Sequence, residues 1–294
     1  MPEDDVLSRV GALQAVTFRN LPEEEFWNPE QDAEMDRDDT TMSMGSSRGI
    51  LVQVGYEKMS YTAILLRSTR PEEQDESVVS VGESERDGFQ HFPLMLVRMP
   101  GSLRETFVEF LASTFDARVS VLALPGTYLT SAFEQYISDL CTNEEGEINI
   151  AEGSRNLRTI IKDTELFIGF DLPNGSATLK TVDIHIARED FPRMVMRGKK
   201  ISRQRDRDGE SPFMDALVTY VKGHLALDLR HERVKVVRIA CGAFVLGAEG
   251  KLKLFQPARG DDGETAGGRA TRTLIGGLLR TAIGGSLSGD VVGD

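Results

Sequence analysis

Residues 234–255 read VKVVRIACGAFVLGAEGKLKLF, and this stretch decides the fold class of the chain. Residues 234–246 are apolar and rich in β-branched side chains, which predicts a strand with a bend at Gly242. Glu249-Gly250 predicts a turn, and residues 252–255 predict a second strand that pairs with the first. The stretch therefore indicates a mainly antiparallel sheet.

Short strands and amphipathic helices extend outward from this stretch to both ends of the chain. In the second half, strands are predicted at 165–172 and 181–186, and helices at 190–196, 211–227 and 271–283. In the first half, strands are predicted at 13–18, 50–54, 61–66, 78–81, 93–97 and 119–124, and helices at 102–115 and 128–140. The predicted class is α+β, with a mainly antiparallel sheet and helices packed on one face.

Composition suggests three segments. Residues 1–48 are acidic, and residues 20–47 offer so little apolar surface that we expect this segment to be largely disordered. A polar break at 143–154 then separates an N-terminal α/β subdomain, 49–150, from a C-terminal one, 151–294, which we expect to bind the partner.

Bulk composition excludes several classes of protein. The 294 residues are 40% hydrophobic and 28% charged, which is ordinary for a globular chain. The longest apolar runs are near ten residues, and a bilayer span needs about 20, so no membrane role is expected. Cys141 and Cys241 are too few for a disulfide framework and suit a reducing compartment.

Charge is distributed unevenly along the chain. The net charge is −13, and residues 1–39 alone carry −9. Residues 188–207 carry +5, and the short helix expected at 190–196 leads into a basic loop within this segment. Seven of their side chains are candidates for DNA or phosphate contact: Arg193, Arg197, Lys199, Lys200, Arg203, Arg205 and Arg207. The alternative is a solvated loop whose bases pair with neighbouring acids.

The apolar strands of residues 234–255 are also candidates for a protein interface. A strand pair near the C-terminus offers a sheet edge to which a partner strand can add. The candidate contact residues are Val236, Phe244, Leu246, Leu252, Leu254 and Phe255. Burial of these side chains in the core of the chain itself is the equally weighted alternative.

No catalytic constellation is evident in the sequence. The four histidines and two cysteines complete no metal-ligand spacing, and no glycine-rich phosphate loop follows a strand. We therefore expect no enzyme, no metal and no cofactor.

A collinear series of segments resembles the CENP-L family of the inner kinetochore. It comprises HFPLML (91–96), TFDARVSVLAL (114–124), VDIHI (182–186), FMDAL (213–217), GKLKL (250–254) and LIGGLL (274–279). The resemblance covers roughly residues 61–283. Two features depart from the family pattern, namely the short N-terminal opening and the composition of the charged insert 193–208.

The resemblance implies a non-enzymatic subunit of the kinetochore, located at the centromere in the nucleus. It implies a saddle-like curved sheet and pairing with a CENP-N-like subunit among other inner-kinetochore proteins, so that centromeric chromatin is linked to the kinetochore for chromosome segregation. Contact with centromeric DNA or nucleosomes and a homodimer are further possibilities.

Two other classes of function stay open. One is a generic α+β interaction adaptor without DNA contact, and the other is an enzyme whose site is assembled from scattered residues. A continuous basic surface that joins Lys199, Lys200 and Arg203 to Lys251 and Lys253 favours the kinetochore protein. Basic clusters on opposite faces favour the adaptor.

Overall fold

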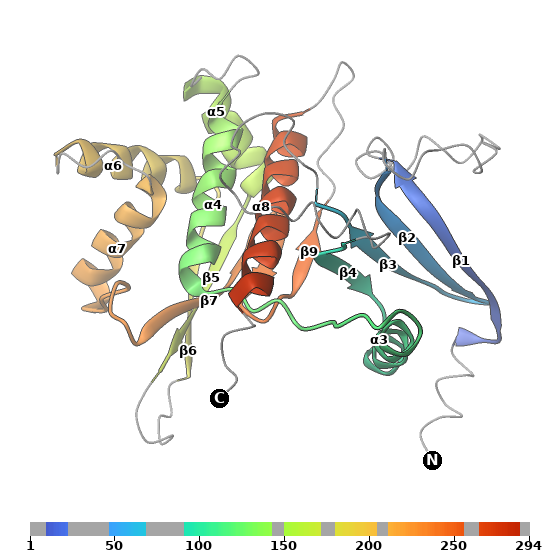
Figure 1. Ribbon diagram of the computed structural model, residues 1–294. Coiled ribbons are helices and arrows are strands. Elements are labelled where there is room, and N and C mark those ends of the chain that lie inside the picture. The colour runs from blue at the N-terminus through green and yellow to red at the C-terminus, as the bar shows by residue number, and fades with distance from the viewer. Residues whose placement is uncertain are drawn as a thin grey trace, which may run out of the picture. The chain divides into compact units, whose positions relative to one another are not determined.

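The computed structural model describes residues 10–22, 47–68, 91–142, 150–171, 180–204, 211–255 and 265–288. The chain divides into two compact units, Met1–Ser120 together with Leu278–Asp294, and Val121–Gly277. Each unit contains one antiparallel sheet, which confirms the predicted α+β class (Figure 1). None of the described helices is long and apolar enough to cross a membrane.

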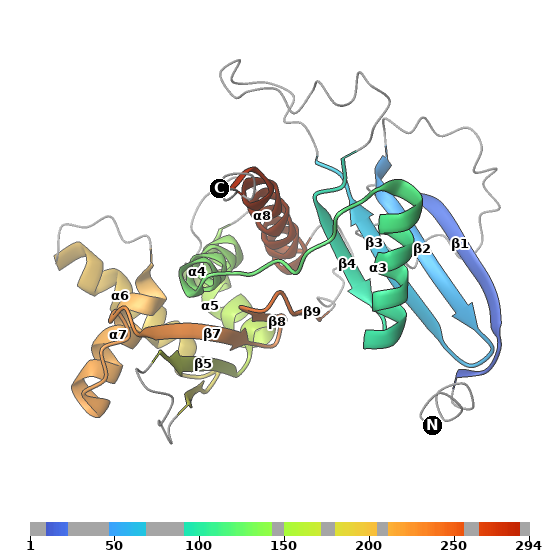
Figure 2. The same cartoon turned by 60° about the horizontal axis from the view of Figure 1, so that its bottom comes forward.

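The first unit is built on a four-stranded sheet with one helix across a face (Figure 2). In chain order and in sheet order its strands are β1 (Leu13–Pro22), β2 (Ser47–Tyr56), β3 (Ser60–Leu66) and β4 (Leu94–Arg98). Helix α3 (Gly101–Phe115) buries Phe107 and Leu111 against Val52 and Ala63 of the sheet. Because successive side chains of a strand point to opposite faces, β2 and β3 present one apolar face to α3.

Three predictions for the N-terminal half differ from the structure or lie outside the residues that it describes. The strand expected at 13–18 runs on to Pro22 and pairs with β2, so the sheet begins well before residue 49. The strand expected at 119–124 does not form, although Leu124 is buried there and its N–H donates to the Ala248 carbonyl at 2.8 Å. The strand expected at 78–81 and residues 23–46 of the expected linker lie outside the described residues.

The second unit is built on a five-stranded sheet with the order β6-β5-β7-β8-β9. Its strands are β5 (Thr164–Phe170), β6 (Thr181–Ile186), β7 (Val234–Ala240), β8 (Phe244–Gly247) and β9 (Leu252–Leu254). The bend expected at Gly242 is a full break between β7 and β8. A side chain at Gly242 would meet the carbonyl oxygens of Ile160 and Ile161, so only glycine lets the backbones approach this closely.

Helices cover one face of this second sheet. In chain order they are α4 (Gly126–Cys141), α5 (Ile150–Asn156), a π-helical turn η2 (Leu157–Ile161), α6 (Phe191–Gln204), α7 (Pro212–Leu225) and α8 (Ala266–Ser288), the last of which contributes to both units. Their core is aromatic: the Phe133 ring of α4 makes edge-to-face contacts with Phe191, Phe213 and Phe244. Edge-to-face packing of this kind adds stability beyond the area that it buries.

Two boundaries differ from those expected. The units divide at residue 120 rather than 150, because α4 packs on β7: the backbone of Gly126 lies directly against that of Val236. The helix expected at 190–196 continues to Gln204, so the segment expected to be a basic loop is mostly helical. Local charge density did not prevent helix formation, because the opposite face of α6 packs on α7.

Candidate partner and nucleic-acid interfaces

Half of the proposed partner-contact residues are buried in the chain's own core. Val236, Phe244 and Leu246 are 9%, 1% and 1% exposed. Phe244 also contacts the Tyr136 ring, with centroids 5.0 Å apart. These three side chains lie on the helix-covered face of the second sheet and are not available to a partner.

The other half lies at the open end of the same sheet. β9 pairs with β8 on one side, with Leu252 opposite Leu246 and Leu254 opposite Phe244. No strand that the structure describes pairs with its outer edge. Leu254 and Phe255 are each 37% exposed, and the Lys253 ammonium lies 4.7 Å from the centre of the Phe255 ring. β9 is therefore an edge strand with apolar side chains within a partner's reach.

Lys253 lies on the face of the sheet that the helices leave open. Pairing places it level with Val245 of β8, while Arg238 of β7 points to the same face and lies 3.5 Å above the Phe167 ring. Arg238 and Lys253 are both exposed. This face is basic on its β7–β9 side and carries Glu165 and Asp183 on its β5–β6 side.

The helix predicted at 190–196 continues through residues 197–204 of the expected basic loop, and together they form the amphipathic helix α6. Phe191, Val195 and Ser202 of α6 are buried, and Ser202 donates a hydrogen bond to Asp215 of α7 at 3.1 Å. A side chain at Gly198 would collide with the Pro212 backbone carbonyl, which shows how closely α6 and α7 pack. The polar face of α6 therefore points away from the core.

Three bases share that polar face. Arg193, Arg197 and Lys200 are exposed and lie at i, i+4 and i+7, the spacing of one helix face. Arg193 forms a solvent-exposed pair with Asp190 at 3.5 Å. We call these three residues the α6 basic stripe.

Of the other four predicted phosphate contacts, only Lys199 has a described side chain. Lys199 is half-buried and lies close enough to Cys141 to oppose part of the rise that burial causes in the pKa of that thiol. Arg203 belongs to α6, but its side chain is not described, and Arg205 and Arg207 lie outside the described residues.

The two basic surfaces lie on opposite sides of the second sheet. Phe191 of α6 contacts the Phe133 ring, which packs on Phe244, so α6 lies on the helix-covered side of the sheet. Lys253 and Arg238 lie on the open side. The continuous basic surface that would have joined them is not formed by these residues. By the criterion set out from the sequence, basic clusters on opposite faces favour the adaptor without DNA contact, and any contact with phosphates would involve each surface separately.

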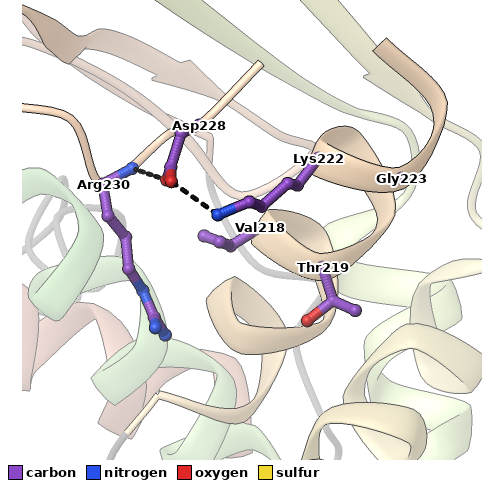
Figure 3. Close-up of a pocket in the computed structure, with 6 residues that line it drawn as sticks. All are labelled: Val218, Thr219, Lys222, Gly223, Asp228 and Arg230. Atoms are coloured by element: carbon purple, nitrogen blue, oxygen red, sulfur yellow. Dashed lines mark hydrogen bonds and ion pairs between the residues drawn. The ribbon is translucent and has the colours of Figure 1, made fainter. Parts of the chain in front are cut away.

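A hollow beside the end of α7 is lined by three charged residues together with Val218, Thr219 and Gly223 (Figure 3). The Lys222 ammonium lies 2.9 Å from Asp228, which also accepts the backbone N–H of Arg230. The pKa of the Asp228 carboxyl is lowered, mainly by the Lys222 hydrogen bond. Arg230 in turn pairs with Asp215. These charges neutralise one another, and the lining includes no histidine or thiol.

Sequence analysis missed one buried charged group in this unit. Glu134 of α4 is 4% exposed and accepts the backbone N–H of Met214 at 2.6 Å, at the start of α7. Burial raises the pKa of Glu134 to about 7, although hydrogen bonds from Met214 and Phe213 oppose the rise. A glutamate inside the apolar stripe of residues 128–140 was the available signal.

The fold and its exposed features define the class of protein. It is an α+β protein with two antiparallel sheets, an open sheet edge and a basic helix face, and its described residues contain no cluster that could hold a metal ion. The family model of CENP-L, centromere protein L, matches residues 1–283, and the chain belongs to this family. The resemblance predicted from sequence is thereby confirmed. No curated protein matches the chain in sequence.

Family membership places the chain among structural proteins of the kinetochore. These proteins act in chromosome segregation at the centromere, in the nucleus, and assemble with other inner-kinetochore subunits. They are not known as enzymes.

Proposed function

We propose that this kinetochore subunit pairs with a CENP-N-like partner through the β9 edge and so links centromeric chromatin to the kinetochore, with no catalytic step of its own. The observation that carries the proposal is the outer edge of β9, which no described strand pairs with, beside two half-exposed apolar residues, Leu254 and Phe255. Family membership makes an inner-kinetochore partner the natural occupant of that edge.

The chemistry of an open edge supports this choice. The outer N–H and C=O groups of β9 have no strand to satisfy them within the described sheet, so a partner strand can extend the sheet by main-chain hydrogen bonds. Lys251 and Lys253 precede the apolar pair Leu254 and Phe255 on the same strand end. Lysines on an edge discourage indiscriminate strand pairing, and a partner with acidic side chains beside its strand would overcome that barrier.

Co-purification with a CENP-N-like subunit tests the β9 edge. We expect Leu254→Asp to abolish co-purification while the isolated variant keeps the melting temperature of the parent. The matched control is Leu225→Asp on α7, because Leu225 is also an exposed leucine of the second unit, at 60%. The control should retain both binding and stability.

Two outcomes of that experiment contradict the proposal. Retained co-purification of Leu254→Asp removes the β9 edge from the interface. Loss of folding in the isolated variant assigns Leu254 to the core, because an unpaired buried charge costs several kcal/mol.

The α6 basic stripe supports a second, separable contact with DNA. Arg193, Arg197 and Lys200 project from a helix face that packs on nothing else described, and local positive charge attracts phosphates even on an acidic protein. No aromatic side chain lies within the stripe, so we propose contact with the backbone of duplex DNA rather than stacking on bases. The generic adaptor without DNA contact is the alternative if the stripe binds no DNA.

A further inference from the structure

The outer strand of the first sheet, β1, has exposed apolar side chains along its first six residues. Leu13, Val16 and Phe18 are 55%, 47% and 52% exposed, and every residue from Leu13 to Phe18 is exposed. β1 pairs with β2 on one side, and no described strand covers its other side (Figure 2). Its only charged residue is Arg19.

The other sheet edges that the structure describes are protected in ordinary ways. β4 has five residues and is mostly half-buried. β6 exposes the charged or polar residues Asp183 and His185 along its edge, and β9 has three residues and carries Lys253. Natural proteins use short length and charge to keep edges from pairing. β1 has ten residues, and its exposed stretch from Leu13 to Phe18 carries no charge.

The sequence of β1 is complementary to itself in one register. If two copies pair antiparallel about a two-fold axis perpendicular to the sheet, one residue must oppose itself. With Thr17 on that axis, Val16 of each copy lies opposite Phe18 of the other, and Gln14 lies opposite Asn20. An axis at Val16 or Phe18 instead sets Gln14 against Phe18 or Val16 against Asn20.

In the same register, the apolar side chains of the two copies lie on one face of the sheet and meet across the axis. Val16 and Phe18 pair with Val54 and Val52 of β2, so they share the face that α3 covers further in. Across the axis they would form a four-residue apolar cluster, and aromatic pairs with β-branched residues are favourable across antiparallel strands. The Arg19 side chains would oppose Ala15 rather than each other, so the two copies do not repel there.

We infer that β1 is a self-association surface whose occupant is β1 of a second copy of this chain, paired antiparallel about Thr17. The two four-stranded sheets then become one continuous sheet. A single strand pair buries less than the ~1,200 Å² of a standard interface, so the dimer is weak and dissociates on dilution. This surface lies in the first unit and does not depend on the partner proposed for β9.

Disulfide cross-linking of the full chain tests the register. The variant is Thr17→Cys in a background with Cys141→Ser and Cys241→Ala, because residues opposed across an antiparallel pair have Cα atoms about 4.5–5.5 Å apart, within disulfide range. Mild oxidation should yield a covalent dimer. The matched control is Gln53→Cys, since Gln53 is exposed and pairs with Thr17 one strand further in. Its copies would lie three strand spacings apart, ~14 Å, which is too far.

Sedimentation of the full chain without the cysteine changes is the second measurement. We expect a monomer–dimer equilibrium that Phe18→Lys shifts to monomer, with an unchanged melting temperature because Phe18 is half-exposed. Gln53→Lys should leave the equilibrium unchanged. A chain that stays monomeric at every soluble concentration, a dimer that survives Phe18→Lys, or cross-linking of Thr17→Cys no faster than Gln53→Cys would each overturn the inference.

Discussion

Glu134 of α4 caps the N-terminus of α7 from a different helix, by accepting the backbone N–H of Met214 at 2.6 Å. Ser211, the N-cap residue by position, makes no side-chain capping bond. The second carboxyl oxygen of Glu134 has no hydrogen-bond partner among the described residues. A buried carboxylate with one bare oxygen is costly, which is why its pKa is raised.

That raised pKa predicts a pH dependence of folding. The pKa of Glu134 rises from 4.5 to about 7, so between these values the folded state binds more protons than the unfolded state. The stabilising contribution of the protonated group is complete below pH 4.5 and is lost as pH rises through about 7. The total effect is up to about 3 kcal/mol, at 1.36 kcal/mol per pKa unit.

Glu134→Gln should therefore flatten the fall in unfolding free energy across this pH range, as measured by denaturant titrations at a series of pH values. The amide can still accept the Met214 N–H. Glu109→Gln on the exposed face of α3 controls for the loss of one carboxyl. An equally steep fall in the Glu134→Gln protein would show that this carboxyl is not the titrating group.

Truncation should separate the core residues of the second sheet from its edge residues. Phe244→Ala should lower the unfolding free energy by about 3–5 kcal/mol, because the side chain is 1% exposed and contacts the Phe133 and Tyr136 rings. Leu254→Ala should cost about 1 kcal/mol or less, since that side chain is 37% exposed. Denaturant unfolding of the isolated protein checks both, and similar losses would contradict the distinction between core and edge.

Charge reversal in the α6 basic stripe should weaken DNA binding. For Arg193→Glu, Arg197→Glu and Lys200→Glu together, the slope of log affinity against log salt should fall by about one unit per lost phosphate contact. The control reverses Lys235, Lys251 and Lys253, which changes the net charge equally but leaves α6 intact. Equal losses in the two triple variants would mean that total charge, not the stripe, governs binding.

A single methyl group should test how closely α6 and α7 pack. Gly198→Ala places its Cβ against the Pro212 carbonyl, which is backbone and cannot rotate away. We expect a loss of about 1–3 kcal/mol of stability, or more, from overpacking. Gly223→Ala on α7 meets nothing within 4 Å and should instead stabilise by up to about 1 kcal/mol, through helix propensity alone. Stabilisation by both changes would mean that the two helices are further apart.

Several elements could be predicted because their signal is local. The pairing of β8 with β9 follows from the two apolar runs around Glu249-Gly250, where Gly250 has a φ of 74° that few other residues tolerate. α4 and α7 follow from apolar residues at helical spacing, and α7 begins with Pro212 as expected. The antiparallel α+β class and the family resemblance rest on such patterns.

The sequence by itself thus determined the class, the order of most elements and the family, because strand alternation and helical periodicity are properties of neighbouring residues. Only the tertiary structure decided that Phe244 is core while Leu254 stands at an edge, since both are apolar residues of adjacent strands. It likewise extended the predicted helix 190–196 through the basic segment to Gln204, because Gly198 and Ser202 pack against α7. Whether a side chain is buried depends on contacts with residues far apart in the sequence, so a local sequence pattern cannot predict it.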